Sequence, residues 1–195
     1  MGRVRTAVLL SGNGTNAEVL MKAATQPDYP AEICLVISNN PDAYGLTRAE
    51  KAGVKAIAIN HQEFNTRAAF DAALHNALIE HNIQLVCLAG FMRVLTPDFV
   101  EKWTDRILNI HPSLLPDFAK TYGTKPIELA FEAGVDETGC TVHIVTPEVD
   151  GGRILAHGKV PLEKEMTLEE LITEVHMMEH ATYPEALATY AATLL

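Results

Sequence analysis

The sequence has little of what marks several common classes of protein. Only three of its 195 residues are cysteines, so a framework of disulfides is not what stabilises the fold. No apolar stretch is long enough to cross a bilayer, and no signal peptide opens the chain. We therefore expect a cytoplasmic protein that keeps its thiols reduced and has no membrane partner.

Basic residues are also scarce. Lys and Arg number 15 against 25 Asp and Glu, which gives a net charge of −10, and no run of basic residues interrupts the sequence. Because a protein that binds nucleic acid needs a basic surface for the phosphates, this composition argues against that partner class. If the ligand carries a phosphate, we expect main-chain amides to hold it rather than a cluster of lysines.

What the sequence does contain is a regular alternation of apolar runs and helical patterns. The apolar runs are short and rich in Val, Ile and Leu, as buried parallel strands are. The expected strands are 4–10, 32–38, 54–59, 84–89 and 106–110, and the expected helices between them are 16–24, 43–52, 66–80 and 96–103. This order predicts an α/β fold with a Rossmann-like, mostly parallel open sheet and helices on both faces.

The pattern changes after His111. A loop rich in Pro and Gly leads to a helix near 125–133 and then to two strands at 140–146 and 153–160, and an amphipathic helix begins near Thr167. The chain has no linker and no internal repeat. Its length suits one domain over residues 1–195, with halves of about 1–110 and 111–195.

Open sheets of this type bind ligands beyond the carboxyl ends of their strands, near the point where the strand order reverses. Three of the predicted strands end in unusual sequences, at residues 11–16, 90–93 and 109–112. We therefore expect the functional site where these three segments meet.

Residues 11–16, Ser-Gly-Asn-Gly-Thr-Asn, follow a strand and open a helix. Gly12 and Gly14 permit a tight turn, and the free amides at the start of a helix favour an anion. The glycine spacing fits neither the dinucleotide fingerprint nor the P-loop. A purely structural interpretation is also open, because Thr15 and Glu18 have the spacing of a capping box.

Asn109 and His111 share one face of a strand end, since they alternate around a single residue. A carboxamide donor and an imidazole there could stabilise an oxyanion and move a proton, or could simply bond to nearby backbone. Asp150 lies in a glycine-rich turn. It either forms that turn or, if it is buried beside His111, favours the imidazolium, and the sequence alone leaves both interpretations open.

The segment from His176 to His180 matches the H-x-x-E-H pattern of inverted zinc peptidases. Such a site needs a third protein ligand, usually an acid well downstream, and only Glu185 remains before Leu195. We therefore expect no metal.

Taken together, several segments are similar to one family, the glycinamide ribonucleotide transformylases that use 10-formyltetrahydrofolate. The similarity runs from about Thr6 to Tyr190, and its most specific pieces are residues 10–16, 88–93, 109–116, 139–143, 149–152 and 179–180. It implies the formyltransferase fold and transfer of a formyl group from that folate to the amine of glycinamide ribonucleotide in de novo purine synthesis. It also implies a cytosolic enzyme with small-molecule substrates, no metal and no covalent intermediate. The choice between a monomer and a homodimer stays open.

The resemblance also implies a role for each part of the site. Asn109, His111 and Asp150 would form the catalytic triad, in which Asp150 keeps His111 protonated. The N-terminal half would be mainly nucleotide-binding and the C-terminal half mainly folate-binding. The residues implied for the phosphate and ribose of the ribonucleotide are Gly14, Thr15, Asn16, His176 and Glu179, and those implied for the pterin are Met92, Arg93, Val94, Leu95, Val145 and Val149.

One segment departs from the family's pattern. Residues 117–123 are about three residues longer than expected, and 125–127 replace a segment that bears histidines in the family. Residues 123–126, Gly-Thr-Lys-Pro, are instead similar to formyltetrahydrofolate hydrolases. Hydrolysis and transfer to another amine are therefore alternatives. An inactive nucleotide-binding homologue is a third, although it would not need Asn109, His111 and Asp150 together.

Overall fold

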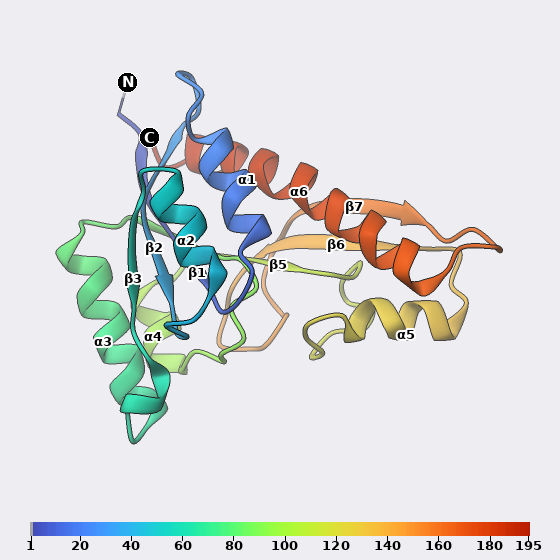
Figure 1. The fold of residues 1–195 in the computed structure, drawn as a ribbon, viewed down its shortest axis with the longest axis horizontal. Coiled ribbons are helices and arrows are strands. Elements are labelled where there is room, and N and C mark those ends of the chain that lie inside the picture. The colour runs from blue at the N-terminus through green and yellow to red at the C-terminus, as the bar shows by residue number, and fades with distance from the viewer. Residues whose placement is uncertain (1) are drawn as a thin grey trace.

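The computed structural model describes residues 2–195 and contains a seven-stranded sheet in the order β3-β2-β1-β4-β5-β6-β7. Every predicted strand and helix is present, and the predicted α/β class is confirmed (Figure 1). The elements are β1 (Val4–Leu10), α1 (Thr15–Ala23), β2 (Ala31–Ser38), α2 (Tyr44–Lys51), β3 (Lys55–Ala58), the short 3₁₀ helix η1 (His61–Glu63), α3 (Arg67–Glu80), β4 (Leu85–Leu88), α4 (Pro97–Lys102), β5 (Ile107–His111), α5 (Lys125–Ala133), β6 (Glu137–Ile144), β7 (Ile154–Pro161) and α6 (Leu168–Ala192).

The order of the strands places a crevice at one edge of the sheet. Strands β1 to β5 run parallel to one another. Strand β6 pairs antiparallel with β5, and β7 pairs antiparallel with β6. The chain moves outward from β1 through β2 to β3 and then returns to β4 on the other side of β1, so the order reverses between β1 and β4. At that point the Ser11 amide donates to the Gly90 carbonyl at 3.1 Å. The segments that follow β1 and β4 therefore meet, as the sequence predicts.

Two apolar layers cover the two faces of the sheet. Helices α1, α2 and α6 pack on one face, where Leu20, Tyr183 and Leu187 are fully buried. Helices α3 and α4 pack on the other, through Leu74 and Phe99 among others. In Figure 1, α6 lies along β6 and β7 and reaches α1, while α5 packs against α6. This cover on both faces explains why the central strands are apolar throughout rather than alternating.

Strand β6 begins at Glu137, three residues before the predicted start at Cys140. The difference lies at Gly139, whose φ of +149° and lack of a side chain break the strand pattern in the sequence. A Cβ atom at this position would lie 1.8 Å from the carbonyl oxygen of Gly158 on β7. The glycine is therefore required by the close approach of the neighbouring strand, and it does not mark a turn.

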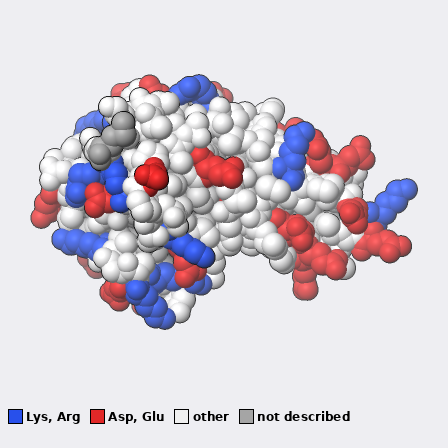
Figure 2. Space-filling model, turned by 90° about the horizontal axis from the view of Figure 1, so that it is seen from above, with Lys and Arg blue, Asp and Glu red and all other residues white. Residues whose placement is uncertain are grey.

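The helices and one face of the molecule bear on the expected lack of membrane-spanning and strongly basic features. None of the helices in the described residues combines the length and apolar character needed to span a bilayer. On the face drawn in Figure 2, Lys and Arg side chains are scattered among Asp and Glu, and acidic side chains gather at one end of the molecule. That face carries no continuous basic surface.

Candidate active site

A cavity of about 760 Å³ lies beyond the carboxyl ends of β4 and β5. Its walls also include residues of β6, of the 145–150 loop and of the segment 120–123. The structure brings together in this cavity every residue that was expected to act in catalysis or to enclose the folate, namely Asn109, His111, Asp150, Met92, Arg93, Val94, Leu95, Val145 and Val149. The residues expected for the ribonucleotide are not part of its lining: Gly14, Thr15, Asn16, His176 and Glu179.

His111 is held between two hydrogen-bond acceptors. Its Nε2 lies 3.3 Å from the carbonyl oxygen of Phe118, and its Nδ1 lies 3.7 Å from Oδ1 of Asp150. A carbonyl can only accept, so Nε2 carries a proton, and Nδ1 faces a carboxylate at ion-pair distance. This arrangement is fully satisfied only when both nitrogens are protonated. The side chain is 4% exposed, however, which works against the charged form.

Burial lowers the pKa of His111 below its usual value, and the carboxylate of Asp150 and the Phe118 carbonyl only partly offset this. In the ligand-free cavity, desolvation of the ring therefore outweighs the attraction of Asp150. The expected protonation of His111 during the reaction stays a prediction.

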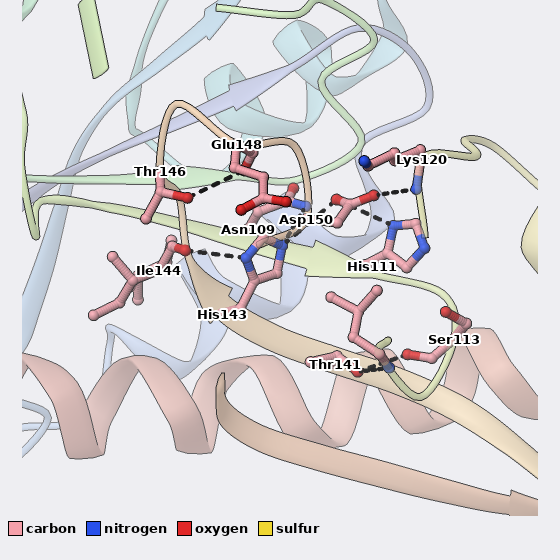
Figure 3. Close-up of polar contacts among 12 residues, drawn as sticks. Asn109, His111, Ser113, Lys120, Thr141, His143, Ile144, Thr146, Glu148 and Asp150 are labelled. Carbon is pink, nitrogen blue, oxygen red and sulfur yellow. Dashed lines mark hydrogen bonds and ion pairs between the residues drawn. The ribbon is translucent and has the colours of Figure 1, made fainter. Parts of the chain in front are cut away.

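Asp150 acts across the cavity rather than within its own turn. Its side chain is 8% exposed, and its Oδ2 accepts a hydrogen bond of 2.7 Å from the Lys120 amide. Oδ1 lies 3.9 Å from Nε2 of His143 in addition to the contact with His111 (Figure 3). The backbone of Asp150 is left-handed, with φ +57°, which turns the carboxylate inward. Of the two interpretations that the sequence left open, this geometry supports the one with Asp150 beside His111.

His143 is a site residue that the sequence reasoning missed. It pairs across the strands with Asn109, whose Nδ2 lies 3.1 Å from its Nε2. Its Nδ1 lies 3.1 Å from the Ile144 carbonyl, so Nδ1 carries the proton and Nε2 accepts from Asn109. Burial lowers the pKa of His143, which favours this neutral form. The imidazole thereby fixes the orientation of the Asn109 amide. Only the register of β5 against β6 reveals this.

The glycine loop at residues 11–16 is shaped by helix α2. Gly14 caps α1 with φ +75°, and a Cβ atom there would lie 2.6 Å from the Cα of Gly45. Arg48 donates to the Asn13 carbonyl at 2.9 Å and to Glu18 at 2.6 Å. The capping box expected at residues 15 and 18 is wrong, because Gly14 is the cap and no side chain bonds to it.

The other expected ribonucleotide residues lie on helix α6 opposite this loop. Nδ2 of Asn16 donates to Oε2 of Glu179 at 3.0 Å, which joins residues 163 positions apart. Burial raises the pKa of Glu179 to about 7, although the bond from Asn16 lowers it. His176 is exposed one turn earlier. The structure thus brings Asn16 and Glu179 into contact, while it gives His176 no bonded partner among the described residues.

The side chains of the H-x-x-E-H segment do not gather into a set of three possible metal ligands. Glu179 is bonded to Asn16, and residues 2–195 contain no cluster of three His, Cys, Asp or Glu side chains that could hold a metal ion.

Comparison with known proteins agrees with this fold and this arrangement of polar groups. The sequence profile of the formyl transferase family matches residues 4–187, and the chain belongs to that family. Among its relatives, the phosphoribosylglycinamide formyltransferase of Haemophilus influenzae is 42% identical over 92% of this chain and 84% of its own length. The trifunctional purine biosynthetic protein adenosine-3 of Gallus gallus is 46% identical over 97% of this chain. The chain spans only 19% of that relative, and 14% of its counterpart in Chironomus tentans.

Solved structures of the same family match the fold over nearly the whole chain. A glycinamide ribonucleotide transformylase from Symbiobacterium toebii superposes with a TM-score of 0.92 at 41% identity, over 98% of this chain and 89% of that one. A phosphoribosylglycinamide formyltransferase from Brucella melitensis also has a TM-score of 0.92, at 42% identity over 97% of this chain and 96% of that one.

Proposed function

We propose that this chain transfers the formyl group of 10-formyltetrahydrofolate to the amine of glycinamide ribonucleotide, a step of de novo purine synthesis. The observation that carries the proposal is that Asn109, His111 and Asp150 line one shared cavity. The names of the relatives support the formyl group and its acceptor, and the formyl transferase family supports the folate donor. The three free cysteines suit the cytoplasm, and both substrates are small molecules.

The mechanism follows from the hydrogen-bond donors of Asn109 and His111 that are not already bonded within the protein. The substrate amine attacks the formyl carbon, a C–N bond forms, and the carbonyl oxygen becomes an oxyanion. One Asn109 N–H is directed to His143, which leaves the second for that oxygen. Nε2 of His111 faces Phe118, so Nδ1 is the nitrogen that serves the reaction. Each well-placed donor of this type is worth about 3 kcal/mol in the transition state.

Asp150 has two functions in this scheme. Its charge favours proton uptake on Nδ1 of His111, which the 3.7 Å separation leaves free to donate to the oxyanion. Its carboxylate is also the nearest base for the proton that the attacking amine loses. That proton passes to the folate nitrogen, directly or through water, as the original C–N bond breaks. Alignment of the two substrates supplies much of the remaining reduction of the barrier.

We further propose that the ribonucleotide binds between the glycine loop and α6, with its phosphate on the amides of Gly14, Thr15 and Asn16. Glu179 would bind the ribose, and His176 would approach the phosphate. Each ligand then draws on both halves of the chain, because Glu179 lies beyond residue 110 while Met92 lies before it. On this proposal, the boundary at about residue 110 divides the sequence but does not separate the site of one ligand from the site of the other.

The hydrolase alternative rests on residues 123–126, and their contacts do not favour it. Thr124 and Lys125 both bond to Glu128, at 2.7 Å and 3.2 Å, at the start of α5. Thr124 and Lys125 do not line the cavity, and of the four residues only Gly123 does.

The test is the release of tetrahydrofolate from 10-formyltetrahydrofolate with and without glycinamide ribonucleotide. We expect release only when the ribonucleotide is present, and we expect the H111A variant, as a control for contaminating enzymes, to show almost none. Equal rates in both reactions would make the protein a hydrolase. No release in either would point to a different amine acceptor.

A further inference from the structure

The longer segment at residues 117–123 contacts two members of the proposed triad through its main chain. The Phe118 carbonyl lies 3.3 Å from Nε2 of His111, and the Lys120 amide donates to Oδ2 of Asp150 at 2.7 Å. Figure 3 shows Lys120 beside Asp150 and His111. One carbonyl and one amide, two residues apart, therefore hold the two ionisable groups from the same side.

These contacts depend on an unusual backbone conformation. Phe118 and Lys120 have φ values of +54° and +63°, a region that residues other than glycine seldom adopt. Such a conformation persists only where its surroundings hold it. Here the Thr121 hydroxyl donates to the Phe118 carbonyl at 2.6 Å, and the Ser113 hydroxyl donates to the Asp117 carbonyl at 2.5 Å.

We propose that residues 117–123 are a positioning element, in which the left-handed backbone at Phe118 and Lys120 orients His111 and Asp150 for the reaction. The inference rests on the proposed function, because it is there that the pair is assigned to catalysis. The Phe118 carbonyl bonds to Nε2 of His111, so Nδ1 is the ring nitrogen that is left for the reacting centre. The amide holds one oxygen of Asp150 and leaves the other facing His111.

The electrostatic consequence is specific. The groups that face His111 are Asp150 from the 145–150 loop and His143 from β6, with Arg93 and Lys120 elsewhere in the cavity wall. Asp150 is the anion among them, and it raises the pKa of His111. If the Lys120 amide no longer held Asp150, the imidazolium would lose part of that support and His111 would release its proton at lower pH.

The experiment compares two substitutions at one exposed position. K120G and K120V both remove the ammonium group, but glycine accepts a left-handed backbone and valine does not. We expect kcat/KM of K120V to fall about tenfold below that of K120G, with the KM for the ribonucleotide equal in the two. The alkaline limb of the pH profile should move to lower pH in K120V alone. Equal kcat/KM in the two variants would overturn the proposal.

A second measurement does not depend on turnover. Nitrogen NMR of the histidine rings in the free protein should show neutral His111 protonated on Nε2, with a pKa lower in K120V than in K120G. An Nδ1-protonated ring in the unmodified protein, or identical pKa values in the two variants, would overturn the positioning role. Because neither substrate is present, this result is separate from any failure of the proposed function. K164A, which alters a lysine outside the cavity lining, is the matched control for loss of charge.

Discussion

The cavity beside β5 and the glycine loop after β1 lie on the same rim, but they are built differently. In the cavity, the proposed functional atoms belong to side chains from β5 and from the 145–150 loop, and neighbouring groups orient them, as His143 on β6 orients Asn109. In the glycine loop the functional atoms belong to the main chain, and the side chain of Arg48 braces the loop from outside. The residues of the glycine loop form no part of the cavity lining.

The contrast follows from what each ligand group requires. A developing oxyanion is stabilised best by donors in a place of low dielectric, which the buried side chains of the cavity provide. A phosphate is already charged, and several amides at a helix start hold it without deep burial. Substitutions in the two regions should therefore affect different kinetic quantities.

The largest effect is expected in the cavity. H111A should lower kcat by about two orders of magnitude, because it removes an oxyanion donor, while the KM for the ribonucleotide changes little. Steady-state kinetics with each substrate varied in turn would measure both constants. H157A, which removes an exposed imidazole on β7, is the matched control. A variant that keeps most of its turnover would remove His111 from the chemistry.

The second effect concerns Glu179, whose carboxyl is 6% exposed and has a pKa raised from 4.5 to about 7. An acid whose pKa is higher in the folded protein stabilises the fold fully below its unfolded pKa. That contribution is lost as the pH rises through the folded value. Between pH 4.5 and 7 the free energy of unfolding should therefore fall by about 3 kcal/mol from this group.

The change that isolates this group is E179Q, which keeps an oxygen for Asn16 and has no proton to lose. Urea denaturation at pH 5 and pH 7.5 should give a smaller difference for E179Q than for the unmodified protein. E174Q, exposed on the same helix, should not alter the difference. The same difference in stability between the two pH values in all three proteins would contradict the assignment of the raised pKa to Glu179.

The smallest of the three effects is expected from G14A. An alanine would have to adopt φ +75° and approach Gly45, which costs about 1–3 kcal/mol. The loop should shift, so the KM for the ribonucleotide should rise while the KM for the folate and the kcat stay close to their original values. G12A is the control, because a Cβ there meets nothing within 4 Å. If G14A instead lowered kcat alone, the two regions would not be separable.

Much of the fold could be predicted because its signals are local. The apolar runs gave all seven strands, and Thr167 marked the start of α6, where it forms a capping box with Glu170. The position of the cavity also followed from local sequence, since Asn109 and His111 end a strand. The error at Thr15 came from a pattern that fits two positions. Its neighbour Gly14 is the cap, in a left-handed conformation and in close contact with Gly45 of α2.

The rest could not be predicted because it depends on contacts between distant segments. His143 contacts Asn109 through the register of β5 against β6, and the lowered pKa of His111 depends on how deeply the ring is buried. The part played by residues 117–123 is of the same kind. Nothing in their sequence indicates that the Phe118 carbonyl faces an imidazole.

The contact of Asn16 with Glu179 can form only late in the synthesis of the chain. The ribosome delivers the glycine loop early and the matching carboxylate 163 residues later. Until α6 arrives, the nascent sheet also lacks Tyr183, whose hydroxyl donates to the carbonyls of Leu88 and Leu108, and the part of one apolar face that α1 and α2 do not cover stays exposed. A chain truncated before α6 should therefore be degraded or bound by chaperones rather than persist as a weaker enzyme, since the same helix completes the core and carries Glu179.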